Sequence, residues 1–129
     1  MKIPSFVTAS AIAVTALALT ACGSSNDSSS ANTVPPDAGL VVDAGPGIKF
    51  DKSDYTATAG SVKVALVNHD SQAHTLDIIA SDGTKLPGEL RVGKSGDIDV
   101  GTYDLPAGTY QVVCLIPGHD NMKSTLTVS

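Results

Sequence analysis

The stretch that decides the fold is Tyr110-Gln111-Val112-Val113-Cys114-Leu115-Ile116-Pro117-Gly118-His119-Asp120-Asn121-Met122-Lys123-Ser124-Thr125-Leu126-Thr127-Val128. Its two ends alternate apolar and polar residues, which predicts two strands. Between them lie a thiol, a short turn, an imidazole and a thioether. Four residues separate Cys114 from His119, and two separate His119 from Met122. A loop this short can bring three donor side chains to one point.

Cysteine, histidine and methionine are soft or borderline ligands, and together they suit copper better than any hard cation. The stretch from Leu105 to Val128 resembles the ligand loop of the cupredoxins, the type 1 (blue) copper proteins. The resemblance implies a small all-β, antiparallel Greek-key β-sandwich. It also implies one copper ion, cycling between Cu(I) and Cu(II), held by Cys114, His119, Met122 and an upstream histidine.

Two upstream histidines compete for the fourth position. His74 is followed by the alternating run Thr75-Leu76-Asp77-Ile78, which matches the strand start where a cupredoxin takes its first histidine. His69, between Asn68 and Asp70, is typical of a surface loop. We therefore expect His74 to be the ligand, because a ligand held at a strand start is better positioned. The resemblance further implies that Thr75 hydrogen-bonds across to the cysteine loop and braces the site.

Met122 leaves two outcomes open. The gap of two residues after His119 is as short as in amicyanin. If the loop folds tightly, the thioether becomes the long axial ligand of the copper. Otherwise Met122 packs beside the site, and the axial position is empty or filled by a backbone carbonyl. We expect the first outcome, because a long axial bond tolerates imprecise placement.

The chain begins with a targeting segment. Lys2 precedes a mostly apolar run from Ile3 to Leu19, which is too short for a transmembrane helix. The ending Leu19-Thr20-Ala21-Cys22 resembles a bacterial lipobox. We expect residues 1–21 to be a lipoprotein signal peptide and Cys22 to carry lipid, which anchors the chain to the extracytoplasmic face of the membrane. An ordinary secretory signal, giving a periplasmic or secreted protein, is the alternative.

Cysteine usage supports a metal site. The chain has two cysteines, Cys22 and Cys114, so lipid on the first leaves the second without a partner. A lone thiol in an oxidising compartment is a liability unless something occupies it. A buried, inert cysteine is the alternative, but His119 and Met122 follow Cys114 within one loop.

The rest of the chain divides into a linker and one domain. Residues 22–46 are rich in Ser, Asn, Gly and Pro, which predicts a flexible tether. Residues 47–129 are enough for one small domain. Apolar residues alternate in short runs separated by turn signals, which predicts half-buried strands. These runs are Val62 to Leu66, Leu76 to Ile78, Ile98 to Val100, Tyr110 to Val112 and Leu126 to Val128.

Charge and motifs exclude several functions. With 8 basic and 13 acidic residues the formal net charge is −5, and no basic cluster is present, so nucleic-acid binding is not expected. Four protein ligands leave copper no open position for a substrate, so an enzyme is not expected. The leading hypothesis is a membrane-tethered electron carrier between redox proteins, such as a membrane oxidase or cytochrome. The alternatives are a copper delivery or storage protein and a metal-free structural sandwich, with zinc as the rival metal.

Overall fold

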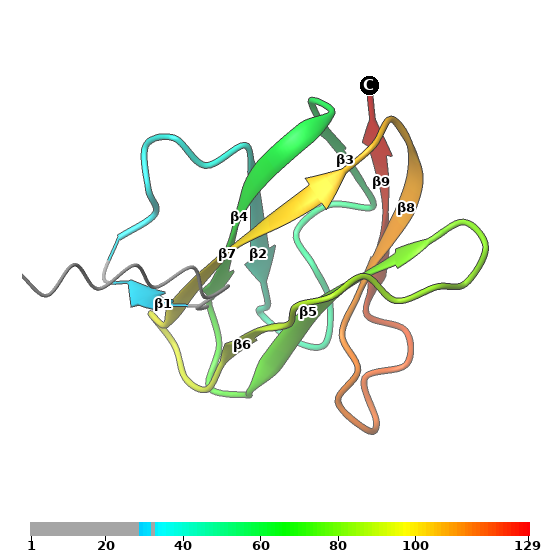
Figure 1. The fold of residues 1–129 in the computed structure, drawn as a ribbon. Helices are drawn as coiled ribbons and strands as arrows, with labels where there is room; N and C mark the ends of the chain where they lie inside the picture. The colour runs from blue at the N-terminus through cyan, green and yellow to red at the C-terminus, as the bar shows by residue number, and fades with distance from the viewer. Residues whose placement is uncertain (1–28, 32) are drawn as a thin grey trace, which may run out of the picture.

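The computed structural model describes residues 29–31 and 33–129, which form two packed β-sheets (Figure 1). Within this part of the chain no helix is long and apolar enough to cross a membrane. The predicted signal peptide 1–21 and the predicted lipid-attachment residue Cys22 lie outside the described residues.

Nine strands make up the two sheets in the described part of the chain. The first sheet has the order β1 (Ser29–Ala31), β7 (Ile98–Leu105), β4 (Gly60–Asn68), β2 (Leu40–Ala44). The second sheet has the order β3 (Asp54–Ala57), β9 (Lys123–Val128), β8 (Gly108–Val113), β5 (His74–Ala80), β6 (Leu90–Val92). The prediction of an all-β, cupredoxin-like sandwich is confirmed.

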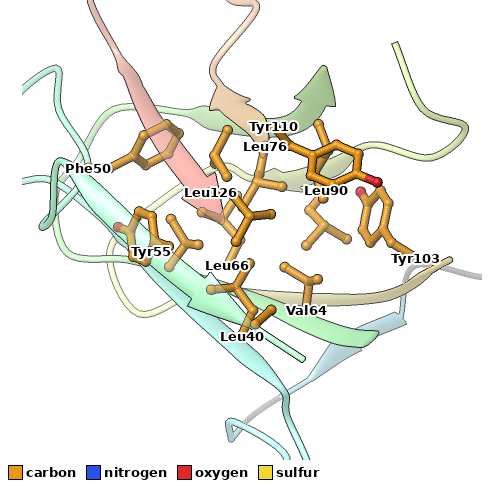
Figure 2. Close-up of a cluster of buried hydrophobic side chains, with 14 of the residues drawn as sticks. Leu40, Phe50, Tyr55, Val64, Leu66, Leu76, Leu90, Tyr103, Tyr110 and Leu126 are labelled. Carbon is orange, nitrogen blue, oxygen red and sulfur yellow. The ribbon is translucent and has the colours of Figure 1, made fainter. Parts of the chain in front are cut away.

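The core lies between the sheets and follows from the period-two pattern of the strands. Val64 and Leu66 on β4 face Leu76 and Ile78 on β5, and all four side chains are fully buried. Figure 2 shows leucine, valine and aromatic side chains from both sheets meeting in this layer. Burying such side chains contributes about 1.5–3 kcal/mol each to folding, so the core holds the strands that carry the site.

The predicted extent of the tether and the predicted start of the domain are wrong in part. The predicted tether 22–46 includes β2, whose Leu40, Val42 and Ala44 are buried in the core. The backbone of β1 also pairs with β7. The sandwich therefore begins before Gly47, the predicted domain boundary.

The sandwich is not purely antiparallel. Strand β2 runs parallel to β4, and β3 runs parallel to β9. The reason is that the chain leaves the first sheet after β2, crosses to the second as β3, and returns as β4 in its original direction. All other ladders are antiparallel, as predicted.

The topology gathers four loops at one end of the sandwich. Strands β2, β4, β6 and β8 end there, and the strands that follow them begin there. In Figure 1 this is the end at which the orange loop joins β8 to β9. Because Val113 pairs with Asp77, Cys114 comes next to the start of β5. The two stretches that sequence analysis singled out therefore meet at this end.

Candidate metal centre

The structure brings His74, Cys114 and His119 together. One possible ligand atom from each lies within 4.8 Å of the others, and in the described residues this is the one cluster of three or more such side chains. The exposed fractions of the three residues are 0%, 5% and 7%. A cluster shielded from water in this way is suited to a bound metal ion, whose ligands must be deprotonated or neutral.

The loop that carries Cys114 and His119 is built from backbone hydrogen bonds. The His119 N–H donates to the Ile116 carbonyl at 3.0 Å, which closes a turn with Pro117 and Gly118 at its centre. Gly118 has a φ of +90°, as the third residue of a type II turn requires. The loop thus turns the His119 side chain back towards Cys114, whose Sγ lies 3.5 Å from His119 Nδ1.

Thr75 connects the two halves of the site. Its backbone N–H donates to Cys114 Sγ at 3.4 Å, and its hydroxyl lies 3.6 Å from the same sulfur. The hydroxyl oxygen also accepts a hydrogen bond of 3.0 Å from the Leu115 N–H. These contacts hold the sulfur in place and direct hydrogen-bond donors at it.

His74 presents one ring nitrogen to the cluster. Its Nε2 lies 3.1 Å from Asp70 Oδ1, while its buried Nδ1 has no hydrogen-bond partner. The His74 and His119 rings are 5.2 Å apart between centroids, at 46°. A buried nitrogen without a partner costs free energy, so the unpaired Nδ1 beside a thiol and a second imidazole fits a metal ligand.

Asp70 is a site residue that sequence analysis missed. Burial acts to raise the pKa of its carboxyl group, but hydrogen bonds from the Gln72 N–H and from His74 outweigh it and leave the pKa below the usual value. The carboxylate is therefore ionised at neutral pH. Asp70-Ser71-Gln72 is a turn-forming sequence, and the Gln72 N–H donates to Asp70 Oδ1 at 2.7 Å just before β5. This pattern predicts the turn but not the contact with His74.

His69 and Met122 are the other two residues considered as ligands. His69 is outside the cluster: its half-exposed side chain lies 2.7 Å from Asp43 through Nε2. Met122 is 1% exposed, and its backbone is tied to the loop. Its N–H donates to the His119 carbonyl at 2.8 Å, and its carbonyl accepts from the Cys114 N–H at 3.0 Å. The loop is therefore folded tightly at Met122, and its axial role stays a prediction.

The donor set fits a copper ion of the type 1 class. Two imidazoles and one thiolate are the trigonal ligands of such sites, and a thioether is their weak axial ligand. Zinc also accepts two histidines and a cysteine, but a methionine is not among its usual ligands.

The architecture is the cupredoxin β-sandwich. This chain matches solved structures of cupredoxins over most of the length of those proteins. The described fold is similar to auracyanin from Roseiflexus castenholzii, with a TM-score of 0.60 and 21% identity, covering 70% of this chain and 95% of that one. Auracyanin A of Chloroflexus aurantiacus gives a TM-score of 0.60 and 22% identity, with 69% and 96% covered.

An amicyanin variant in the reduced state matches as well. Its TM-score is 0.61 at 22% identity, covering 82% of this chain and 95% of amicyanin. Auracyanin A is described as a blue copper protein, and the Roseiflexus auracyanin was reduced with dithionite. The chain matches no family model and no curated protein.

Proposed function

We propose that this chain is a one-electron carrier built on a single type 1 copper ion. The observation that carries the proposal is the buried cluster of His74, Cys114 and His119, in which His74 Nδ1 has no hydrogen-bond partner. When bound, the copper ion supplies the one-electron couple between Cu(I) and Cu(II). The similarity to auracyanin and amicyanin supports the same assignment.

The residues of the chain would hold the ion in one geometry. His74 Nδ1, Cys114 Sγ and His119 Nδ1 would hold the copper ion strongly, and the Met122 thioether would be a weak fourth ligand. Strands β5 and β8 of one sheet carry the ligands from both sides, and Thr75 links them. A site fixed by this many contacts moves little when the charge of the ion changes, which favours fast electron transfer.

The role of Met122 is tested by its replacement with leucine. The two side chains are close in volume, so Met122→Leu should cost less than about 1.5 kcal/mol in folding free energy. Losing the thioether should leave the protein blue, because three strong ligands remain. The reduction potential should rise by about 59 mV or more. This equals a tenfold change in the ratio of the site's affinities for Cu(II) and Cu(I). An unchanged potential and spectrum would show that Met122 is not a ligand.

Electrons would enter and leave through the end of the sandwich that carries His74, Cys114 and His119, which we call the metal end. Among the described residues, the two exposed large hydrophobic side chains are Ile48, 42% exposed, and Leu115, 52% exposed. Ile48 lies in the loop after β2 and Leu115 in the loop after β8, both at the metal end. Exposed apolar side chains gathered at one end of a molecule suit a protein-protein contact. We infer that redox partners dock here, close to the edge of His119.

Electron self-exchange between two copies of the protein tests this function without knowledge of the partner. NMR line broadening in mixtures of the Cu(I) and Cu(II) forms gives the rate. Leu115→Glu should lower it roughly tenfold or more, because two copies would then meet through like charges. The potential should not change, since the Leu115 contact with Thr75 is made by its backbone.

Thr58→Glu provides the matched control. Thr58 is exposed in the turn between β3 and β4, at the opposite end of the sandwich, and the variant adds the same charge. Equal slowing in both variants would refute docking at the metal end. Undetectable self-exchange in the unmodified protein, with Cu(I) passing readily to a chelator, would favour copper delivery or storage instead.

We also propose that a lipid anchor holds the protein on the membrane. The Leu19-Thr20-Ala21-Cys22 ending supports lipid attachment at Cys22 and a place on the extracytoplasmic face of the membrane. The folded strands begin close to this residue in sequence, with β1 at Ser29. An intact mass of the membrane-bound protein that shows an unmodified Cys22 would rule this out.

A further inference from the structure

The Asp70 carboxylate is enclosed by three nitrogen atoms at the back of His74. Its Oδ1 accepts a hydrogen bond of 2.7 Å from the Gln72 N–H and lies 3.1 Å from His74 Nε2. Its Oδ2 accepts one of 2.9 Å from the Gly47 N–H. The Asp70 side chain is only 12% exposed. The carboxylate is therefore fixed in position by two loops that are distant in sequence.

The space for this carboxylate depends on its neighbours. The buried Asn68 accepts a hydrogen bond of 3.0 Å from the Asp70 N–H through its side-chain oxygen. At Gly45, a Cβ atom would lie 2.7 Å from Asp70 Oδ2, closer than such atoms approach. Gly45 also has a φ of +82°, which favours glycine. Glycine at this position thus leaves the room that Asp70 occupies.

Both oxygens of Asp70 already accept backbone N–H hydrogen bonds, from Gln72 and from Gly47, so Asp70 meets His74 as an acceptor and the ring proton belongs on Nε2. This leaves Nδ1 with a free lone pair, and Nδ1 is the buried nitrogen without a hydrogen-bond partner in a residue that clusters with Cys114 and His119. We propose that Asp70 is a positioning residue that acts through His74, fixing Nδ1 as the donor and lowering the reduction potential of the bound copper. This inference rests on the proposed copper site.

The direction of the effect follows from charge. A carboxylate bound to the far nitrogen of an imidazole places negative charge on the ring and makes the near nitrogen a stronger donor. A stronger, more negative donor favours Cu(II) over Cu(I), because the oxidised ion carries the larger charge.

The chain contains its own control for this effect. Asp43 Oδ1 lies 2.7 Å from His69 Nε2, so the same carboxylate–imidazole pair occurs a second time. The His69 N–H donates to the Ala44 carbonyl, which places this pair beside the end of β2, with His69 directly before Asp70 in the chain. His69 is not in the ligand cluster. Asp43→Asn therefore removes one charge near the site without touching a ligand.

The experiment compares Asp70→Asn with Asp43→Asn in the copper-loaded full chain. Asparagine keeps one oxygen that can accept from Gln72 and His74, loses the acceptor for the Gly47 N–H, and can present its NH2 group to His74 instead. The charge is lost, and a proton on Nε2 is no longer enforced. Asp70→Asn should lower the preference for Cu(II) over Cu(I) tenfold or more, which is a rise in potential of about 59 mV or more. Asp43→Asn should change this preference less than twofold. Equal shifts in the two variants, or none in Asp70→Asn, would overturn the proposal.

A second measurement does not need copper. Nitrogen-15 chemical shifts of the metal-free protein report which ring nitrogen of His74 carries the proton. We expect Nε2–H alone in the unmodified protein and in Asp43→Asn, and a mixture of both tautomers in Asp70→Asn. A proton on Nδ1 in the unmodified protein would refute the inference about Asp70. If this result is as expected but no blue copper site forms, the proposed function fails and the positioning by Asp70 stands.

Discussion

Cys114→Ala is expected to abolish the blue colour of the copper-loaded protein and to reduce its copper affinity by more than about 100-fold. Residues that only touch a metal ligand are already worth 10–100-fold in affinity, and Cys114 would be a ligand itself. The colour depends on this residue because the intense absorption of type 1 sites arises from charge transfer between thiolate and copper. The measurement is a copper titration followed by visible absorption.

The second cysteine of the chain gives the control. Cys22→Ser should leave the colour and affinity of the purified protein unchanged, because Cys22 belongs to the predicted lipid anchor and the ligand cluster takes its thiol from Cys114. Cys114 is buried, and alanine removes only the sulfur, so the variant should fold. Blue colour retained in Cys114→Ala would exclude the proposed site.

Replacing His74 is expected to have an effect nearly as large. His74→Ala should bleach the site and lower the copper affinity by more than about 100-fold. His69→Ala should change the affinity less than about threefold, since its half-exposed side chain contacts Asp43 and not the cluster. A visible spectrum of each variant with one equivalent of copper, and a denaturation curve without metal, separate loss of the ligand from loss of the fold.

If the assignment of His74 as the ligand is wrong, His69 is the upstream ligand instead. A bleached His69→Ala together with a blue His74→Ala would contradict the contacts of both residues. The comparison is well matched because both histidines lie at the same end of the sandwich and each is paired with an aspartate. They differ in burial and in their position relative to Cys114.

Much of the fold could be predicted from the alternation of apolar residues. The runs on β4, β5, β7, β8 and β9 were found, because apolar and polar residues alternate along them, although β5 is buried on both faces over residues 74–78. Strands β1, β2, β3 and β6 were not. β2 reads Leu40-Val41-Val42, a continuous apolar run near prolines, and β6 has only three residues. Such short segments become strands through their pairing in the sheet, which local pattern does not reveal.

The site was predictable to the extent that its residues lie close in sequence. Cys114, His119 and Met122 share one loop, so their spacing alone pointed to a common centre. His74 was chosen because a strand pattern follows it. Asp70 could not be found in the same way, because its contacts with Gly47 and His74 depend on how two loops pack.

The most direct test of a type 1 copper centre is the visible spectrum of the purified protein during stepwise addition of Cu(II). The buried cluster of His74, Cys114 and His119 predicts an intense blue absorption that saturates at one copper per chain. The colour should disappear on reduction and return on reoxidation. A pale solution showing only weak absorption at saturation would contradict a copper-bound Cys114 thiolate and with it the proposed electron carrier.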